Sequence, residues 1–86
     1  MKLFSMILVL VSFSTSLAYA KKTCTSEPKE KWMKVEDFKK MKEGEGFVIK
    51  KFKQPGTCYE IYGINKEGKK VEIYFNPVDG TPVKSK

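Results

Sequence analysis

The stretch from Cys58 to Gly80, CYEIYGINKEGKKVEIYFNPVDG, constrains the fold more than any other part of the chain. Two runs rich in Tyr, Ile, Val and Phe flank the tetrapeptide Asn-Lys-Glu-Gly at residues 65–68, with Asn at the first turn position and Gly at the fourth. This pattern is typical of a β-hairpin closed by a type I turn with a bulge, because Gly tolerates the left-handed backbone that such a turn requires. The sequence therefore predicts two antiparallel strands here.

The turn also predicts which residues of the hairpin share a face. If Ile64 lies opposite Lys70, one face is apolar and the other is mixed. The apolar face carries Tyr59, Ile61, Gly63, Val71, Ile73 and Phe75. The mixed face carries Glu60, Tyr62, Ile64, Lys70, Glu72 and Tyr74. We expect the apolar face to pack in the core and the mixed face to meet water or a partner.

The region before the hairpin is expected to contain one short helix. Between residues 32 and 46, Val35, Phe38 and Met41 recur every three positions, which indicates an amphipathic helix with one apolar side. Gly46 is a natural end for this helix. Because so short a helix is marginal in water by itself, its apolar side must pack on the sheet.

A further strand is expected between the helix and the hairpin. Residues 47–52 are mostly apolar, but their alternation fails in the middle, which we interpret as a β-bulge at Lys50 and Lys51. Residues 54–57, Gln-Pro-Gly-Thr, have Pro and Gly at the central positions of a type II turn. Residues 76–80, Asn-Pro-Val-Asp-Gly, end the last strand, because Pro has no ladder donor and Asp-Gly favours a turn.

The order of these elements predicts the fold class α+β, with one short N-terminal helix packed on a three-stranded antiparallel meander. The expected segments are a signal peptide at 1–20, an extended N-terminal arm at 21–31, the α+β domain at 32–83 and a tail at 84–86. We expect residues 81–86 to fray, with Val83 pinned down. The expected core consists of Trp32, Val35, Phe38, Met41, Phe47, Ile49, Tyr59, Ile61, Val71, Ile73 and Phe75.

The first twenty residues have the pattern of a cleaved secretory signal peptide. Lys2 gives a positive start, residues 3–17 are largely apolar, and Ala18-Tyr19-Ala20 has the small-x-small pattern of a cleavage site. An uncleaved membrane anchor is the alternative, but the apolar run is short for a bilayer span and is interrupted by Ser and Thr. We therefore expect the protein to be periplasmic or secreted, with no stable membrane anchor after cleavage.

Cys24 and Cys58 are the two cysteines of the chain, and we expect them to form a disulfide that staples the fold. In an exported chain a cysteine pair favours a disulfide, and closing a loop of roughly 35 residues stabilises by about 4 kcal/mol in the chain-entropy model. This bond would tie the arm across the mixed face of the hairpin. A metal pair and a redox dithiol are the alternatives. Because the chain has no His and no Cys-x-x-Cys motif, we expect no metal site and no cofactor.

The chain is basic, with a net charge of +7, and all 17 of its basic residues are Lys. Without Arg, it lacks the planar fork that recognises phosphate or carboxylate in a bidentate way. The lysines are spread in singles and pairs among acidic residues, as on a solvated surface. The alternative is attraction to an anionic partner such as an acidic protein, a cell-envelope polymer or nucleic acid. We expect no specific recognition of nucleic acid.

Few side chains of this chain are suited to catalysis, and we expect an enzyme activity to be absent. The usual base for a Ser or Cys nucleophile is missing, because there is no His. Glu60 and Glu72 lie diagonally on the mixed face, where an acid and base pair is conceivable, but solvated strand carboxylates are the simpler interpretation. Tyr62 and Tyr74 either contact a partner or cover the back of a thin sheet. We expect no catalytic residues and take these four residues as a candidate partner-binding face.

Several short motifs occur in an order and spacing that resemble a known family. After the early Cys they are Trp32 before the helix, Gly46-Phe47, Cys58-Tyr59-Glu60, Glu67-Gly68-Lys69-Lys70-Val71-Glu72 and Asn76-Pro77-Val78-Asp79-Gly80. Together they resemble the small, stand-alone PepSY domain proteins that bacteria export, and the similarity covers residues 24–83. Two positions depart from the pattern. Asn76 stands where many such sequences have Asp, and Lys34 stands where a better helix cap is usual.

The resemblance implies a non-catalytic α+β module. PepSY domains occur in the propeptides of some secreted metallopeptidases and are thought to inhibit or regulate peptidases near the cell surface. By this analogy we expect an exported binding module whose partner is a peptidase or another envelope protein. The alternative is a cationic secreted protein that binds an anionic polymer or a membrane surface through its lysines.

Overall fold

The computed structural model of the protein describes residues 23–86, so the expected signal peptide at residues 1–20 lies outside the described residues. In chain order, the elements of the described part are the 3-10 helix η1 (Lys29–Lys31), the helix α2 (Val35–Gly44), and the strands β1 (Val48–Lys53), β2 (Tyr59–Ile64), β3 (Lys70–Phe75) and β4 (Pro82–Ser85). The fold class is α+β, as expected.

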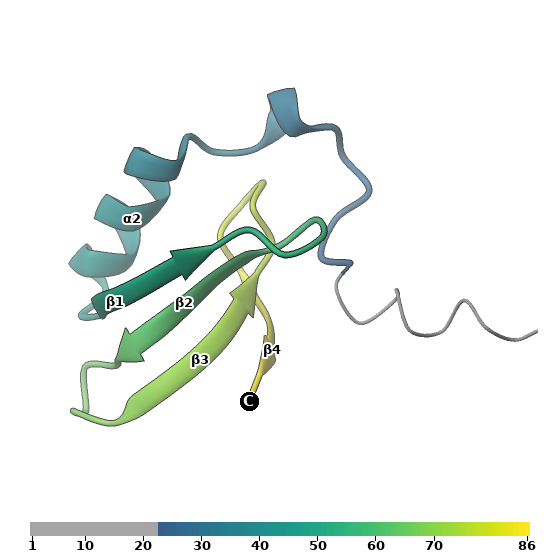
Figure 1. Cartoon of the computed structure of the whole chain (residues 1–86). Helices are drawn as coiled ribbons and strands as arrows, with labels where there is room; N and C mark the ends of the chain where they lie inside the picture. Colours follow the sequence, from purple (N-terminus) through teal and green to yellow (C-terminus); the bar gives the residue numbers. More distant parts are fainter. Residues whose placement is uncertain (1–22) are drawn as a thin grey trace, which may run out of the picture.

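The strands form one antiparallel sheet in the order β1-β2-β3-β4, so each strand pairs with its neighbour in sequence. Helix α2 lies against one face of this sheet, which we call the inner face (Figure 1). We call the opposite face the outer face. The residues that the strand pairing assigns to the outer face are Val48, Lys51, Lys53, Glu60, Tyr62, Ile64, Lys70, Glu72, Tyr74 and Lys84.

The fourth strand corrects the expected three-stranded meander. Residues 81–86 are expected from the sequence to fray, but Pro82–Ser85 pair antiparallel with β3, and Tyr74 lies opposite Lys84. The four residues of this strand are all exposed. They have no alternation of apolar and polar side chains, so the strand depends on the loop that brings it beside β3 rather than on its own pattern.

The loop at residues 76–80 reverses the direction of the chain between β3 and β4. The Gly80 N–H donates to the Asn76 carbonyl at 2.7 Å, and the Asn76 N–H donates to the Thr81 carbonyl at 2.8 Å. Gly80 has a φ of 78°, and a Cβ at this position would meet the Met41 methyl group of α2. The left-handed backbone therefore favours glycine, whereas the end of the flexible Met41 side chain could move aside.

The bulge expected in the first strand is confirmed. β2 and β3 pair in the register expected from the turn, whereas the register of β1 against β2 shifts between Ile49 and Lys51. Gly63 lies beside this bulge, and a Cβ added there would meet the carbonyl oxygen of Val48. The bulge brings the backbone of β1 so close that only a residue without a side chain fits opposite it.

Phe38 of α2 is the centre of the core and is fully buried. Its ring centroid lies 4.9 Å from that of Tyr59 and 5.4 Å from that of Phe75, both in edge-to-face geometry. The other members of the core are Ile61, Trp32, Met33, Val35, Met41, Phe47, Ile49, Phe52 and Ile73. The expected core residue Val71 lies outside this cluster, because its cross-strand neighbour is Gly63, which offers no side chain.

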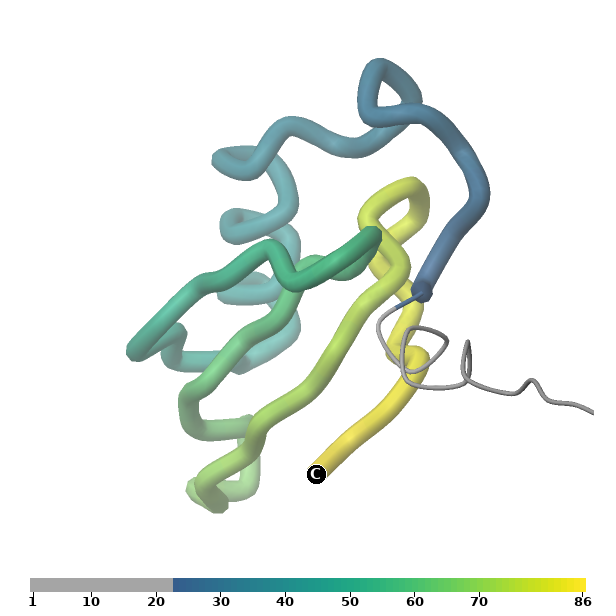
Figure 2. The backbone as a smooth tube through the Cα atoms, turned by 45° about the vertical axis from the view of Figure 1, so that its right-hand side comes forward, coloured from purple at the N-terminus to yellow at the C-terminus, as the bar shows by residue number. Residues whose placement is uncertain are grey.

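A disulfide joins Cys24 to Cys58, with their Cα atoms 5.0 Å apart, which confirms the expected staple. The same end of the arm is held by two hydrogen bonds, because the backbone N–H groups of Cys24 and Thr25 donate to the Thr57 hydroxyl at 2.8 and 3.3 Å. Figure 2 shows the described part of the arm following the end of the sheet toward α2. The sequence predicted an arm that crosses the outer face, but this part of the arm does not cross the middle of that face.

The far end of the arm is fixed to the core by backbone and tyrosine hydrogen bonds. The Met33 N–H donates to the Pro77 carbonyl at 2.8 Å, and the Tyr59 hydroxyl donates to the Met33 carbonyl at 2.6 Å. The Trp32 indole N–H donates to the Glu27 carbonyl at 3.0 Å. The arm is thus anchored at both ends, and these anchors lie at the Cys58 end of β2 rather than at its turn end.

Candidate functional site

The four residues of the candidate partner-binding face lie together at the centre of the outer face. Glu60 pairs across the strands with Tyr74, and Tyr62 pairs with Glu72. Their exposure differs, because Glu60 is 3% and Tyr74 6% exposed, whereas Tyr62 and Glu72 are half-buried. The expected solvation of both carboxylates is therefore wrong for Glu60. This residue lies two positions after the fully buried Cys58, at the end of the face that the disulfide closes.

Glu60 and Glu72 share a hydrogen bond that moves their pKa values apart. Burial raises the pKa of Glu60, and the hydrogen bond with Glu72 and the negative charge of Glu72 raise it further. The same hydrogen bond lowers the pKa of Glu72, and so does the hydrogen bond with Tyr62. The bond to Glu72, together with burial, raises the pKa of Tyr62 to about 12. Protonation of the carboxyl pair is therefore more favourable on Glu60 than on Glu72, and Tyr62 is a neutral phenol at physiological pH.

One oxygen of each carboxyl group, Oε2 of Glu60 and Oε2 of Glu72, has no hydrogen-bond donor among residues 23–86. The Glu72 oxygen still lies 3.4 Å from the Lys86 ammonium, at ion-pair distance without hydrogen-bond geometry. The Glu60 oxygen has no such neighbour. A buried carboxyl oxygen without a donor costs less when the group is protonated, which agrees with the raised pKa of Glu60.

Lysines from both edges of the sheet flank this acidic pair. On the β1 side, Lys53 lies opposite Glu60, and its ammonium lies 5.2 Å from the ring centroid of Tyr62. On the β4 side, the Lys86 ammonium lies 5.6 Å from the ring centroid of Tyr74. Acids, tyrosines and lysines thus alternate across the centre of the outer face, and the polar groups there largely satisfy one another.

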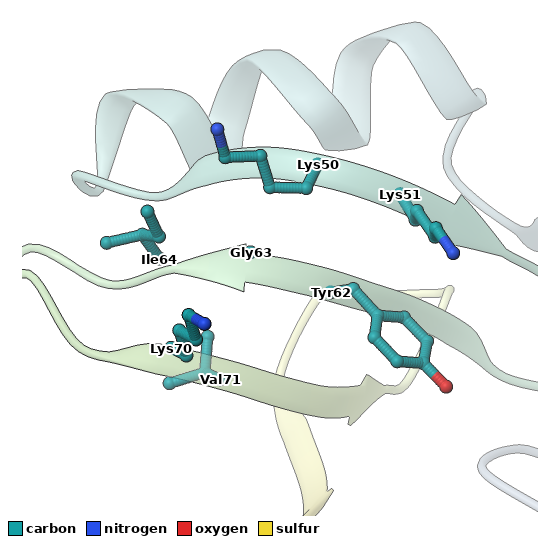
Figure 3. A pocket seen from close by; sticks show the side chains of 7 residues that line it. All are labelled: Lys50, Lys51, Tyr62, Gly63, Ile64, Lys70 and Val71. Atoms are coloured by element: carbon teal, nitrogen blue, oxygen red, sulfur yellow. The ribbon is translucent and has the colours of Figure 1, made fainter.

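A shallow depression of about 280 Å³ lies beyond this network, toward the turn between β2 and β3. Its lining residues are Lys50, Lys51, Tyr62, Gly63, Ile64, Lys70 and Val71 (Figure 3). Its floor includes the backbone of Gly63 and is flanked by the apolar side chain of Ile64. Its rim carries three lysines, and none of the three takes part in an ion pair within the described part of the chain.

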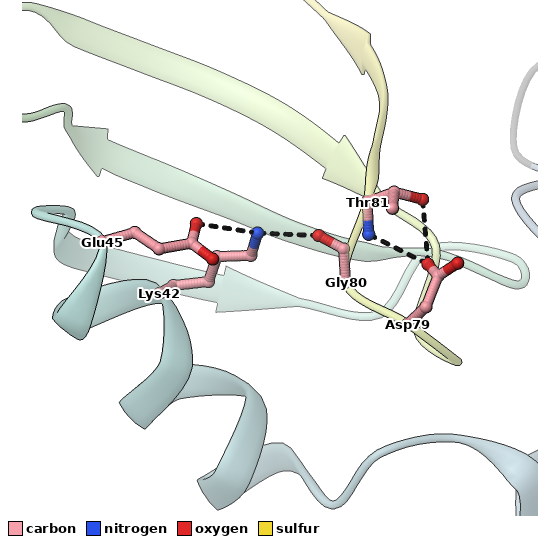
Figure 4. A network of polar contacts seen from close by, with 5 residues as sticks. All are labelled: Lys42, Glu45, Asp79, Gly80 and Thr81. Carbon is pink, nitrogen blue, oxygen red and sulfur yellow. Dashed lines mark hydrogen bonds and ion pairs between the residues drawn. The ribbon is translucent and has the colours of Figure 1, made fainter.

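A second polar network, on the side of α2, centres on Lys42, which is only 3% exposed. Its ammonium donates to the Gly80 carbonyl at 2.7 Å and to the Glu45 carboxylate at 3.1 Å (Figure 4). The ammonium also lies 4.2 Å from the ring centroid of Phe75. We did not single out this residue from the sequence. The available signal was its spacing, because Lys42 follows Phe38 by four positions and so lies on the apolar side of the helix.

The loop that Lys42 contacts is also held by its own side chains. The N–H and the hydroxyl of Thr81 donate to Asp79 Oδ1 at 3.0 and 2.8 Å, and these bonds lower the pKa of Asp79. The Asn76 carboxamide oxygen accepts a hydrogen bond from the Val78 N–H at 2.8 Å. Every partner in this network belongs to the loop or to the helix end, so its role is structural.

Several residue types that often react with substrates or bind metals are oxidised, missing or dispersed in the described part of this chain. Cys24 and Cys58 are oxidised to a disulfide, and the chain contains no His. Among residues 23–86 no group of three or more His, Cys, Asp or Glu side chains lies close enough together to hold a metal ion. The raised pKa of Tyr62 makes its phenol a poor nucleophile. What the outer face offers instead is tyrosine, lysine and apolar surface.

Comparison with known proteins assigns the chain to a family. It matches the family model described as the peptidase propeptide and YPEB domain, or PepSY, over residues 3–86. The protein belongs to the PepSY family. The resemblance drawn from the short motifs is thereby confirmed. Neither the curated proteins nor the solved structures contain a significant match to this PepSY chain. Within residues 23–86, no helix is both long enough and apolar enough to cross a membrane.

The motifs that carry the PepSY resemblance correspond to structural features of the domain. Cys58-Tyr59-Glu60 begins β2 with the disulfide and a core tyrosine, and residues 76–80 form the loop that Lys42 anchors. At the first departure from the family pattern, Asn76 accepts a loop N–H with its side-chain oxygen, as an Asp would. At the second, Lys34 makes no side-chain capping bond to α2. The motifs therefore specify the fold and do not converge on a catalytic centre.

Proposed function

We propose that this protein is a non-catalytic binding module, exported to the cell envelope, that inhibits or regulates a peptidase. The observation that carries this proposal is the PepSY match over residues 3–86, because the description of that family names the propeptide of peptidases. A propeptide-like domain acts on a peptidase by contact, so this function requires a stable surface and no reactive group of its own.

The composition of the outer face supports contact as the mode of action. Tyrosine side chains provide large contact area at a small cost in conformational entropy, and they are frequent at the energetic centres of protein interfaces. Tyr62 is half-buried and remains accessible beside the depression. Glu60 and Tyr74 lie on the same face but are almost fully buried, so they offer little surface to a partner.

The two edges of the sheet are less suited to a partner than the outer face. Addition of an extended peptide to a sheet requires a regular edge strand with free backbone groups. Strand β1 is interrupted by its bulge and carries Lys50, Lys51 and Lys53, and such bulges and lysines oppose edge pairing. Strand β4 has only four residues. We therefore assign partner contact to the outer face.

An inhibition experiment tests this function. The oxidised protein is immobilised and used to capture proteins from an envelope extract, and any retained peptidase is assayed on a fluorogenic peptide with increasing amounts of free protein. We expect peptidase activity among the retained proteins and a dose-dependent change in its rate. Protein reduced and alkylated at Cys24 and Cys58 is the control, because the staple of the fold is then lost.

Recovery of no peptidase under varied salt and pH contradicts the proposal, as does a retained peptidase whose rate is unchanged at saturating protein. A peptidase that responds equally to the reduced, alkylated control also contradicts it, since the response then does not depend on the folded domain.

Attraction to an anionic polymer is the second candidate function, and the unpaired lysines around the depression favour it. Lys50, Lys51 and Lys70 have no ion-pair partner within residues 23–86, in a chain of net charge +7. Such binding is electrostatic, so its affinity falls steeply with added salt. Retention on an anionic polymer that is unchanged between low and high salt rules this candidate out.

A further inference from the structure

We propose that the depression over Gly63 binds one apolar side chain from an extended segment of a partner protein, and that this segment carries acidic residues on both sides of the apolar one. The inference rests on the proposed function, because it names the chemistry of the segment that the partner peptidase offers. The sequence did not predict the depression, and Tyr62 is the one lining residue that it placed in the candidate partner-binding face.

The shape of the depression suits a single side chain. The backbone of Gly63 forms part of the floor, between Tyr62 and Ile64, whose side chains lie on the outer face. Tyr62 and Ile64 rise beside it (Figure 3). Its volume of about 280 Å³ accommodates one large aliphatic or aromatic side chain.

An exposed apolar side chain lies next to the depression. Val48 lies opposite Ile64 on the outer face and is 51% exposed, which makes it one of two large apolar side chains in the described chain with such exposure. Val48 and Ile64 thus place two apolar side chains opposite each other at the turn end of the sheet. Exposed apolar surface rimmed by polar groups is typical of a site that a partner covers.

The rim of the depression carries positive charge. Lys50 on β1 and Lys70 on β3 lie on the two sides of β2, and Lys51 lies beside Tyr62. The acidic residues of the face do not compensate them, because Glu72 is paired with Lys86. The field around the depression is therefore positive, and carboxylates of a partner complement it.

The geometry of an extended peptide matches this arrangement. Strands that are separated by one other strand lie about 10 Å apart, so the stems of Lys50 and Lys70 begin at roughly that distance. In an extended segment, residues two positions before and two positions after a given residue point to the same side and lie about 13 Å apart. One apolar residue in the depression thus places acidic residues two positions away within reach of both lysines.

A titration followed by nuclear magnetic resonance tests the inference. The isotopically labelled, oxidised protein is titrated with the capped peptide Glu-Ser-Leu-Ser-Glu, and with two matched peptides in which Leu is replaced by Ser or both Glu by Gln. We expect the amide signals of residues 62–64 and 70–71 to shift. Because burial of a leucine side chain is strongly favourable, we expect the Leu peptide to bind about tenfold tighter than its Ser counterpart.

Charge variants provide the matched control. The double variant Lys50→Gln, Lys70→Gln should bind the Glu-Ser-Leu-Ser-Glu peptide three- to tenfold more weakly, because each exposed ion pair contributes modestly. The double variant Lys34→Gln, Lys40→Gln changes the net charge equally at exposed positions near or on the helix and should bind as the unchanged protein does. Circular dichroism confirms that both variants are folded.

Three results overturn the inference. The first is the absence of shifts at the depression at millimolar peptide. The second is equal binding of the Leu and Ser peptides, which indicates polyanion binding through lysines alone. The third is an equal loss in both double variants. If the captured peptidase still responds to the Lys50→Gln, Lys70→Gln variant as to the unchanged protein, the proposed function holds at another surface and only this site fails.

Discussion

Two charged side chains of this domain are almost fully buried, and each is accommodated in a different way. Lys42 directs its ammonium to the Gly80 carbonyl and the Glu45 carboxylate. Glu60 has an oxygen without a donor, and burial beside Glu72 raises its pKa. A buried charge must be either paired or neutralised, because its desolvation is costly. Lys42 is paired, and burial shifts Glu60 toward its neutral form.

The substitution Glu60→Gln tests the state of this carboxyl group. Because the pKa of Glu60 is raised on folding, its contribution to stability is fully present below the unfolded pKa and is lost as the pH rises through the folded pKa. Gln stays neutral and can still donate to Glu72. We therefore expect the variant to be more stable than the unchanged protein at pH 7, by roughly 1 kcal/mol, and this advantage to disappear below about pH 4.

Urea unfolding across this pH range measures the effect, and Glu72→Gln is the control. The pKa of Glu72 is lowered on folding, so its contribution is present above the unfolded pKa and is lost as the pH falls through the folded pKa. This variant should be less stable at neutral pH, with a difference that closes in acid. A destabilising Glu60→Gln at pH 7 contradicts a raised pKa of Glu60.

Substitution of Lys42 tests the buried ammonium. Lys42→Ala removes the donor to Gly80 and leaves a cavity beside Phe75, so we expect a loss of about 2–4 kcal/mol in the free energy of unfolding. Lys42→Met keeps the packing and loses only the polar contacts, with an expected cost of about 1–2 kcal/mol. The exposed Lys40→Ala should change stability by less than about 0.5 kcal/mol. Equal thermal stability of the Lys42→Ala and Lys40→Ala variants refutes the structural role.

At the scale of elements, local pattern predicted the pieces whose causes are local. The hairpin register follows from the turn at residues 65–68, and the bulge follows from the broken alternation of β1. β4 was missed, because Pro82–Ser85 have no strand pattern and depend on a loop that α2 anchors. The burial of Glu60 was missed for a similar reason. Residue alternation predicts the face on which a side chain lies, but its exposure also depends on what covers that face.

The residue pattern of the sequence also could not predict the depression. It is lined by the bulged part of β1 and by Gly63 of β2, and only the pairing of the two strands brings these residues together. The sequence did indicate a bulge at Lys50 and Lys51, and it placed Gly63 on the hairpin. What it lacked was the register between β1 and β2, which is a tertiary property.

The coupling of bulge and glycine gives a prediction for the sheet. Gly63→Ala places a Cβ against the carbonyl oxygen of Val48, and the backbone must move to relieve it. We expect a loss of about 1–3 kcal/mol in the free energy of unfolding by urea. Gly44→Ala is the control, because a Cβ there meets nothing within 4 Å at the end of α2. It should be neutral or stabilising by up to about 1 kcal/mol. Equal effects of the two substitutions argue against the close approach.

At the scale of the whole molecule, the two faces of the sheet have different roles. The inner face holds the aromatic core and the Lys42 network, which fix the helix and the loop at residues 76–80. The outer face is anchored at one end by the disulfide of Cys24 and Cys58 and carries the depression at the other. The accessible part of the outer face is therefore its turn end, around Tyr62, Ile64 and Lys70.

Loss of the disulfide tests how far this arrangement depends on its staple. The double variant Cys24→Ser, Cys58→Ser should lose about 4 kcal/mol in the free energy of unfolding, because the unfolded chain is then no longer restricted. Urea unfolding with and without a reductant checks this. The reductant should lower the stability of the unchanged protein to that of the variant and leave the variant unaffected. An unchanged protein that resists fully effective reduction without loss of stability refutes the estimate.

The most direct test of the central claim, that a PepSY domain contacts its peptidase through the outer face, is a calorimetric titration of the captured peptidase with the oxidised protein and its two double variants. The unchanged protein and Lys34→Gln, Lys40→Gln should bind with the same affinity, and Lys50→Gln, Lys70→Gln should bind three- to tenfold more weakly. Equal affinities for all three proteins, or no binding by any of them, contradict the claim.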